Sequence, residues 1–213
     1  MSRLLSIDPV NPQPEVLAEA RDVLGSGGVV ALPTISFYGL CADAMNPEAI
    51  SRVFAIKKRS ADKPLPLLIP DASWVEKLAT GVDRRCRTLM RAFWPGGLTL
   101  VLRANPQAPS HLVSNEGSIG LRVPSHPVAA NLLRLFNRPV TGTSANLAGS
   151  EGCVDAACVQ STLPVQPDLI LDGGPTPGTA GSTVVDLSEQ DARILRAGLV
   201  LEKDIEATLA SAG

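Results

Sequence analysis

Apolar residues recur along the chain at two spacings, one typical of helices and one typical of buried strands. Helical spacing is clear over residues 14–24, where Pro14 stands in the first turn and Gly25 lies just beyond the end. Asn46 and Pro47 have the types expected of a helix cap and a first helical residue. Helices are predicted over 14–24, from Asn46 toward Lys57, and over 71–78, 83–93, 126–136, 155–161 and 203–210, with Asp71 and Ser125 as further caps.

Short continuous apolar runs predict strands, because strands are only about four to eight residues long. Residues 28–32 have the composition of a strand that is buried on both faces. Pro66, within the run 65–69, favours an edge strand or a bulge, and residues 33–44 are expected to form a loop with polar groups. The predicted strands are 28–32, 65–69, 98–102, 119–123, 140–143, 169–171, 183–187 and 193–195.

The order of these elements predicts an α/β fold. Helices and strands intermix without a strict strand–helix–strand repeat, and no linker is long enough to divide the chain. We therefore expect a single domain over residues 1–213, built on one mixed sheet with helices around it. No accessory domain is expected at the C-terminus, since the tail after Leu199 is short.

Composition excludes several classes of protein. Of the 213 residues, 45% are apolar and 19% are charged, as in a globular chain with one substantial core. No apolar stretch approaches the roughly 20 residues that span a bilayer, and Asp8 and Pro9 come too early for a secretory signal. We therefore expect a cytoplasmic protein with no membrane partner. The net charge of −2 gives no global attraction for nucleic acid, and 3% aromatic residues are too few for a base-stacking surface.

The four cysteines do not form a metal-binding pattern. Cys41, Cys86, Cys153 and Cys158 lack the Cys-x-x-Cys spacing, and the chain has only two histidines to assist them. A disulfide framework is not expected in a chain this long and apolar. We expect four buried or free thiols and no metal site.

Polar clusters, rather than a common signature, carry the candidate chemistry. Motifs for phosphate loops, dinucleotide folds, zinc proteases and serine hydrolases are absent. Polar residues instead follow predicted strands, at the ends where ligands bind in α/β sheets. A basic run extends from Arg52 to Lys63, with Asp62 as its one acid. The candidates are Thr34, Lys57, Arg59, Arg122, Thr143, Ser144, Asn146, Ser182 and Arg196.

Several candidates also have a purely structural interpretation. Thr34 and Ser144 could each close a turn, Arg122 could pair with an acid at a sheet edge, and Ser182 could begin a strand. Together the candidates supply lysine, arginine and small hydroxyls, with no nucleophile–base pair. That combination suits the binding of a polyanion and the charge stabilisation that phosphoryl and nucleotidyl transfer require.

Six motifs follow one another along nearly the whole chain. They are Pro33-Thr34 with Tyr38-Gly39-Leu40, Lys57-Lys58-Arg59, Trp94-Pro95-Gly96-Gly97-Leu98-Thr99, Arg122-Val123-Pro124-Ser125-His126-Pro127, Thr143-Ser144-Ala145-Asn146, and Leu171-Asp172-Gly173-Gly174 through Ser182-Thr183-Val184-Val185-Asp186. In this order they resemble the YrdC-like family, whose members include L-threonylcarbamoyladenylate synthases. The resemblance implies a twisted mixed sheet with helices around a concave, basic surface.

The resemblance further implies a nucleotidyltransferase that joins L-threonine, bicarbonate and ATP into threonylcarbamoyl-AMP and releases pyrophosphate, with Mg²⁺ offsetting the charge. Partner proteins of the family then pass the threonylcarbamoyl group to tRNA. The resemblance implies, position by position, that Lys57 and Arg59 hold the ATP phosphates and act in catalysis. The other residues expected to bind the nucleotide are Ser144, Asn146 and Arg196. The residues expected to surround the threonine are Thr34, Arg122, Thr143 and Ser182.

Two positions depart from the family's usual pattern. Ile35 stands where the synthases commonly have glutamate, and Leu68 where many have histidine. Both changes concern the amino-acid substrate more than ATP. Two alternatives therefore stay open: a carbamoyl-adenylate-forming enzyme with another acceptor, and a non-catalytic module for double-stranded RNA or tRNA, whose affinity would fall steeply with salt.

Overall fold

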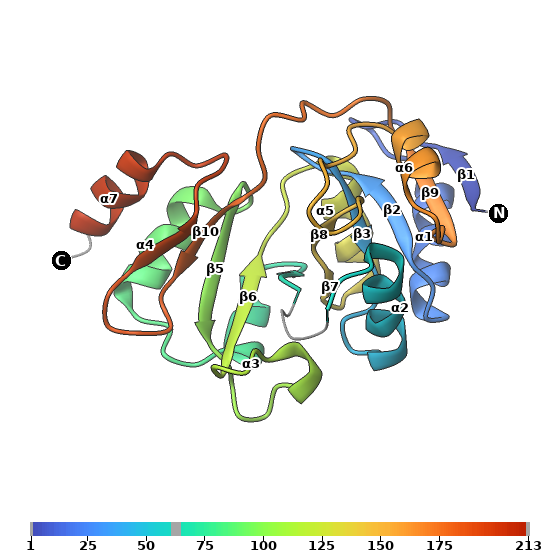
Figure 1. The fold of residues 1–213 in the computed structure, drawn as a ribbon. Coiled ribbons are helices and arrows are strands. Elements are labelled where there is room, and N and C mark those ends of the chain that lie inside the picture. The colour runs from blue at the N-terminus through green and yellow to red at the C-terminus, as the bar shows by residue number, and fades with distance from the viewer. Residues whose placement is uncertain (1, 61–64, 212–213) are drawn as a thin grey trace.

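The structure is a computed structural model that describes residues 2–60 and 65–211, so Asp62 and Lys63 of the basic run lie outside the described residues. Figure 1 shows the order of its elements. The helices are α1 (Pro14–Gly25), α2 (Pro47–Lys57), α3 (Val75–Leu78), α4 (Arg84–Phe93), α5 (Pro127–Phe136), α6 (Ala156–Thr162) and α7 (Glu202–Ala210). The strands are β1 (Arg3–Ser6), β2 (Val30–Pro33), β3 (Tyr38–Cys41), β4 (Leu67–Leu68), β5 (Leu98–Arg103), β6 (Ser118–Arg122), β7 (Val140–Thr141), β8 (Thr143–Ser144), β9 (Leu169–Asp172), β10 (Thr183–Asp186) and β11 (Arg193–Arg196).

The strands form two mixed sheets, where a single sheet was expected. The first sheet has the order β1-β9-β2-β3-β8, and the second has the order β11-β10-β5-β6-β4-β7. The sheets stand side by side in Figure 1. The chain passes from one to the other at Gly142, because β7 pairs with β4 and β8 pairs with β3. The predicted strand 140–143 is thus divided between the sheets, while the α/β class is confirmed.

Helices cover both faces of the first sheet. Val30 and Leu32 of β2 face a core shared with α1 and α5, whereas Ala31 faces a core shared with α2 and α6. Neighbouring residues enter opposite cores because successive side chains of a strand point to opposite faces. This packing accounts for the continuous apolar run that predicts β2.

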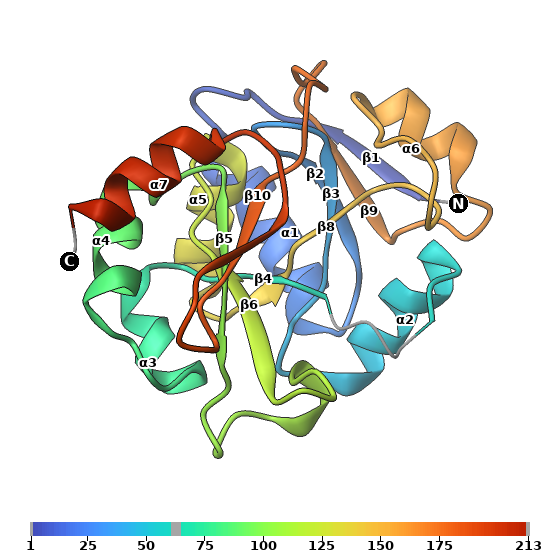
Figure 2. The same cartoon turned by 60° about the vertical axis from the view of Figure 1, so that its left-hand side comes forward.

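Helices α3, α4 and α7 cover one face of the second sheet. Leu98, Leu100, Ile119 and Val185 belong to a core that includes residues of α3, α4 and α7, which lie together on the outer side in Figure 2. The opposite face carries the intervening residues of the same strands. That face remains open toward the first sheet and forms part of the cleft described below.

Three strand predictions need correction. Residues 33–44 are not a simple loop, because they contain β3, a fully buried strand that forms a hairpin with β2. The sequence does not predict β1, since only Leu5 of that strand is even partly buried at the edge of its sheet. The edge position inferred from Pro66 is wrong, because β4 begins after this proline and pairs on both sides.

The helix ends follow the capping chemistry, with one correction. The Asn46 side chain accepts hydrogen bonds from the backbone nitrogens of Glu48 and Ala49, which confirms its predicted role at the start of α2. α5 begins after His126 instead of Ser125, because His126 Nδ1 accepts a hydrogen bond of 3.3 Å from the Val128 nitrogen.

A disulfide joins Cys153 to Cys158, so the expectation of four free thiols is wrong. Asp155 caps α6 between the two cysteines and turns the chain back, which brings their Cα atoms to 5.4 Å. Cys41 and Cys86 are buried free thiols, as expected. Burial raises the pKa of each of these two thiols to about 12, so both stay protonated at neutral pH.

Candidate functional site

A cleft of about 920 Å³ lies between the two sheets. Its volume is within the range of sites that hold small molecules. All of the candidate residues selected from the sequence line it: Thr34, Lys57, Arg59, Arg122, Thr143, Ser144, Asn146, Ser182 and Arg196. The fold therefore brings together residues that are distant in the sequence, while the role of each residue stays a prediction.

The open face of the second sheet forms one wall of the cleft. Along β5 and β6, alternate residues line the cleft, and the residues between them lie in the core behind the sheet. We call this surface the second-sheet wall. Its members are Thr99 and Val101 of β5, Ser118, Gly120 and Arg122 of β6, Val184 of β10, Leu68 of β4, and Ser182 at the start of β10.

Arg122 is a buried cation on the second-sheet wall. It is 8% exposed, and its Nε donates a hydrogen bond of 2.6 Å to the carbonyl oxygen of Gly96. Burial, and then the neighbouring charge of Arg196, lower its pKa to about 10. Across the sheet it is in register with Leu68, so an apolar side chain flanks it on that side. No carboxylate pairs with Arg122 among the described residues. The alternative in which Arg122 pairs with an acid at a sheet edge is therefore excluded for that part of the chain.

Arg196, Ser182 and Thr99 form a hydrogen-bonded cluster beside Arg122. The guanidinium of Arg196 donates to the Ser182 carbonyl oxygen at 2.7 and 3.1 Å and to Ser182 Oγ at 3.0 Å. Ser182 Oγ lies 2.8 Å from Thr99 Oγ1. Arg196 is expected on the nucleotide and Ser182 on the threonine, so their contact means that the two predicted subsites share a boundary.

Lys57, at the end of α2, holds the opposite wall. Its Nζ donates to the carbonyl oxygens of Ser144 at 2.5 Å and Asn146 at 2.8 Å, with Asn146 Oδ1 at 3.5 Å. The residue is only 3% exposed. Burial, and to a smaller extent the charge of Arg59, lower the pKa of Lys57 to about 8. Lys57 is therefore charged at neutral pH, and it donates its hydrogen bonds to Ser144 and to Asn146 in the loop that follows β8.

The loop from Ser144 to Ser150 is closed by its own side chains. The Ser144 hydroxyl donates to Asn146 Oδ1. Asn146 Nδ2 donates to the carbonyl oxygens of Leu147 at 2.8 Å and Ser150 at 2.7 Å. We call this surface, with Lys57 and the turn at Thr34, the first-sheet wall. Its amide and hydroxyl groups are held in place by contacts within the protein, which favours binding because little further ordering is needed.

Thr34 closes the turn between β2 and β3. Its hydroxyl donates to the Phe37 carbonyl oxygen at 2.7 Å and accepts from the Ser36 nitrogen at 3.3 Å. The structural interpretation of Thr34 is thus correct, and the side chain still lines the cleft. Gly39 leaves little room for a side chain opposite it, because a Cβ there would lie 3.2 Å from Thr34 Cγ2 and 3.4 Å from the Thr143 carbonyl oxygen.

Some lining residues are not among the candidates. Thr99 and Ser118 face the cleft because of strand alternation, a signal that was available in the predicted strands. Tyr38 is fully buried, and its hydroxyl donates to the Gly174 carbonyl oxygen at 2.8 Å and accepts from the Gly173 nitrogen at 3.2 Å. No periodicity signals that tertiary contact.

The lining of the cleft is cationic. Among the described residues, the side chains that line it include five cations and no carboxylate; the cations are Lys57, Lys58, Arg59, Arg122 and Arg196. Neither Lys57 nor Arg122 nor Arg196 forms an ion pair within the part of the chain described here. Buried cations without acidic partners are costly, so the cleft is suited to an anionic ligand that supplies the missing charge.

Two further findings limit the chemistry. Within residues 2–60 and 65–211, no group of three or more His, Cys, Asp or Glu side chains is placed to hold a metal ion. In the same ranges, none of the helices combines the length and the apolar content needed to cross a bilayer.

Comparison with known proteins gives a consistent match. The sequence profile of the Sua5/YciO/YrdC family, described as telomere recombination, matches residues 22–198. The threonylcarbamoyl-AMP synthase of Bacillus subtilis (strain 168) is 35% identical over 203 residues, which are 95% of this chain and 59% of that protein. This chain therefore spans less than two thirds of the length of that relative.

Solved structures share the fold over almost the whole chain. Sua5 of P. abyssi, solved as a complex with L-threonine, has a TM-score of 0.91 and 31% identity, with 97% of this chain and 61% of that chain covered. E. coli YciO, a protein described as uncharacterized, has a TM-score of 0.88 and 31% identity, with 96% and 100% covered. The expected fold is thereby confirmed.

Proposed function

This chain belongs to the Sua5/YciO/YrdC family, and from that premise we propose that it is a threonylcarbamoyl-AMP synthase. It converts L-threonine, bicarbonate and ATP to threonylcarbamoyl-AMP and pyrophosphate. The product supplies the threonylcarbamoyl group that transfer proteins attach to tRNA. The observation that carries the proposal is the cationic lining of the cleft, which has no carboxylate among its described residues, in a fold whose P. abyssi representative was solved with L-threonine.

The two walls of the cleft suit the two substrates. The first-sheet wall offers Lys57, Arg59 and the closed loop of Ser144 and Asn146, which together suit a triphosphate and its nucleoside. Lys57 meets a phosphate by exchanging its weakest partner, Asn146 Oδ1 at 3.5 Å, for a phosphate oxygen. Arg196 extends this site from the opposite side.

The second-sheet wall suits an amino acid. Only the Nε of Arg122 is hydrogen-bonded within the described residues, so the terminal amino groups are available to a carboxylate. Ser182 lines the cleft on this wall, and Thr34 and Thr143, which are neighbours at Gly39, line it on the first-sheet side. Mg²⁺ enters as part of the ATP substrate, since the described lining offers hydroxyls and carbonyl oxygens rather than carboxylates.

The reaction needs no protein nucleophile. The amine of threonine takes up bicarbonate with loss of water and becomes a carbamate. A carbamate oxygen then attacks the α-phosphorus of ATP, and the bond to the bridging oxygen of the leaving pyrophosphate breaks. The protein orients the two substrates and offsets the charge on the pyrophosphate, with Lys57 and Arg59 in that role. Cys41, the thiol in the lining, is protonated because its pKa is about 12.

A second candidate is a carbamoyl-adenylate-forming enzyme that uses another acceptor. Leu68 favours it, because this apolar side chain is in register with Arg122 and only 5% exposed. A carboxylate on Arg122 places the rest of the acceptor near hydrocarbon on that side. Ile35, in contrast, is not among the described residues that line the cleft.

Pyrophosphate release from ATP tests both candidates. The purified chain is assayed with threonine and bicarbonate, with each omitted in turn, and then with a panel of amino acids. We expect release that requires bicarbonate and an amino acid, with threonine as the best acceptor. Turnover of ATP that is no faster with threonine than without it contradicts the synthase. Faster release with another amino acid selects the second candidate.

A further inference from the structure

Two segments of the cleft are hydrogen-bonded to two consecutive residues, Cys153 and Val154, which we call the anchor, and a third segment lies just before them in the chain. The Tyr38 nitrogen donates to the Cys153 carbonyl oxygen at 2.8 Å, so β3 is fastened here. Thr176 donates to the Val154 carbonyl oxygen twice, from its nitrogen at 2.8 Å and from Oγ1 at 3.1 Å. Thr176 belongs to the strap, residues 173–182, which connects β9 in the first sheet to β10 in the second.

The third segment is the loop that carries Asn146. Asn146 Nδ2 donates to the Ser150 carbonyl oxygen at 2.7 Å, and Ser150 precedes the anchor by only three residues. Between them, Gly152 lies against the ring of Phe37, since a Cβ at Gly152 would be 2.7 Å from the ring. A displacement of the anchor therefore reaches the proposed nucleotide loop, the turn before β3 and the strap at once.

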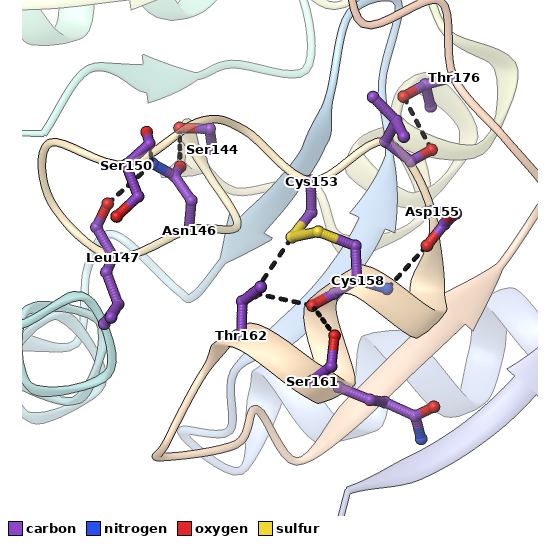
Figure 3. Close-up of a disulfide and its surroundings, with 12 residues drawn as sticks. Ser144, Asn146, Leu147, Ser150, Cys153, Asp155, Cys158, Ser161, Thr162 and Thr176 are labelled. Carbon is purple, nitrogen blue, oxygen red and sulfur yellow. Dashed lines mark hydrogen bonds between the residues drawn. A yellow bond between two sulfur atoms is a disulfide. The ribbon is translucent and has the colours of Figure 1, made fainter.

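The disulfide fastens the anchor to α6 (Figure 3). Cys158 lies in the first turn of α6, and its nitrogen donates to Asp155 Oδ1 at 2.7 Å. Val159, the next residue, is fully buried in the core beneath the first sheet. The bond between Cys153 and Cys158 is thus the one covalent link, besides the backbone, from the anchor to α6 within the described residues.

We propose that Cys153 and Cys158 form a reversible thiol–disulfide exchange site that sets the affinity of the cleft for its ligand. The oxidised pair holds the anchor and gives the tight-binding state, and the reduced pair gives the weak-binding state. The co-reactant is a dithiol reductant. The affinity part of this inference rests on the proposed nucleotide site, whereas the exchange site itself does not.

The exposure of the two cysteines sets the direction of attack. Cys153 is 1% exposed and Cys158 is partly exposed, so a thiolate of the dithiol attacks Cys158 Sγ. The disulfide breaks, a mixed disulfide forms on Cys158, and Cys153 leaves as a thiolate. Thr162 Oγ1 lies 3.2 Å from Cys153 Sγ, and its hydroxyl, which donates to the Cys158 carbonyl oxygen at 2.7 Å, can rotate to donate to the thiolate.

The second thiol of the reductant completes the exchange. It attacks the mixed disulfide and releases Cys158, so the reductant becomes a disulfide. Two electrons and two protons pass to the cysteine pair, which ends as two thiols. Cys41 and Cys86 stay outside this exchange because both are buried and protonated.

Thiol counting and ATP binding test the proposal on the full chain. Alkylation and mass spectrometry after denaturation count free thiols in oxidised, dithiothreitol-reduced and reoxidised protein. The Kd for ATP is measured calorimetrically on the same samples. We expect two free thiols before reduction and four after it, with a Kd that rises at least about fivefold on reduction and returns on reoxidation.

A double variant controls for other effects of the reductant. Cys153→Ser with Cys158→Ser is expected to bind ATP like the reduced protein and to show no response to dithiothreitol. Four free thiols in protein treated with an oxidant, or a Kd that stays within about twofold when four thiols are counted, overturn the proposal.

Hydrogen exchange separates this inference from the proposed function. Reduction is expected to speed amide exchange over residues 146–154 and 174–178, and to leave α4 unchanged. If neither redox form binds ATP but reduction still speeds amide exchange in these segments, the assignment of the nucleotide site is wrong and the proposed exchange site is retained. Unchanged exchange after full reduction overturns the exchange site, whatever ATP does.

Discussion

The two walls of the cleft hold their charged groups in opposite ways. On the first-sheet wall, Lys57 is engaged with the carbonyl oxygens of Ser144 and Asn146 before any ligand arrives. On the second-sheet wall, Arg122 makes one hydrogen bond within the described residues, to Gly96, and leaves its terminal amino groups unused. The first wall is built from loops that need the cation for their own shape, and the second from strands that do not.

This difference separates stability from binding. A buried cation that holds a loop contributes to folding, because its removal leaves carbonyl oxygens without donors. A buried cation whose N–H groups lack acceptors lowers the free energy of unfolding, and a bound anion offsets that loss. Variants of Lys57 should therefore lose stability and affinity together, and variants of Arg122 should lose mainly affinity.

The largest effect is expected for Arg122→Met. Removal of a charged hydrogen-bond partner for the substrate carboxylate costs about 2–5 kcal/mol, so kcat/KM for threonine should fall by about a hundredfold. The free energy of unfolding should change by less than about 1 kcal/mol, because an unpaired buried charge is removed with it. Pyrophosphate release and urea denaturation measure the two quantities.

Two controls sharpen this test. Arg122→Lys keeps a charge but loses the planar fork, so it should recover only part of the activity. Arg91→Met removes an exposed arginine from α4, outside the cleft, and should leave activity unchanged. An unaltered KM for threonine in Arg122→Met would remove this arginine from the amino-acid site.

Lys57→Met should weaken ATP binding by about thirtyfold and lower the free energy of unfolding by about 2–3 kcal/mol. Both effects follow from the loss of donors to the loop that carries Asn146. Lys58→Met is the matched control, because Lys58 lines the same cleft but is exposed. Its charge is screened by water, so its loss should raise the Kd only about twofold. Equal effects of the two variants would contradict the assigned role of Lys57.

Gly142→Ala tests the point where the walls join. A Cβ at Gly142 would lie 2.9 Å from Leu68 Cγ and 3.3 Å from the Pro66 carbonyl oxygen, so the variant should lose about 1–2 kcal/mol of unfolding free energy. Gly25→Ala, with nothing within 4 Å of the added atom, should be neutral. In a double-mutant cycle, Leu68→Ala should reduce the cost of Gly142→Ala, and strict additivity would contradict the clash.

The sequence predicts the second-sheet wall better than the first. Strands at 98–102 and 119–123 are recovered as β5 and β6, and alternation along them places Thr99 and Arg122 on the same face. The convergence of the candidate residues in one cleft likewise follows from motifs at strand ends.

Tertiary contacts determine what the sequence does not predict. The sequence predicts a loop over β3, because Tyr38–Cys41 forms a strand only through its pairing with β2 and β8. The division at Gly142 depends on Leu68 and Pro66, which are more than seventy residues away in the sequence. The engagement of Lys57 by carbonyl oxygens has no sequence signal, because any residue could supply them.

The smallest expected effect, a pH dependence of ATP binding, separates the walls without mutation. The pKa of Lys57 is about 8 and that of Arg122 about 10, so between about pH 7 and 9 chiefly the first wall changes charge. Because an anion prefers protonated Lys57, affinity should be highest below pH 8 and should fall as the pH rises.

One proton is linked to binding, so the Kd should rise by at most about tenfold per pH unit above 8. Calorimetry in buffers of different ionisation heat counts the proton taken up as ATP binds. Lys57→Met should abolish this uptake near pH 8.5, while Lys58→Met should retain it. A Kd that does not change from pH 7 to 9 in the unaltered chain would mean that Lys57 does not bind the phosphates. Its charge would then only stabilise the loop that carries Asn146.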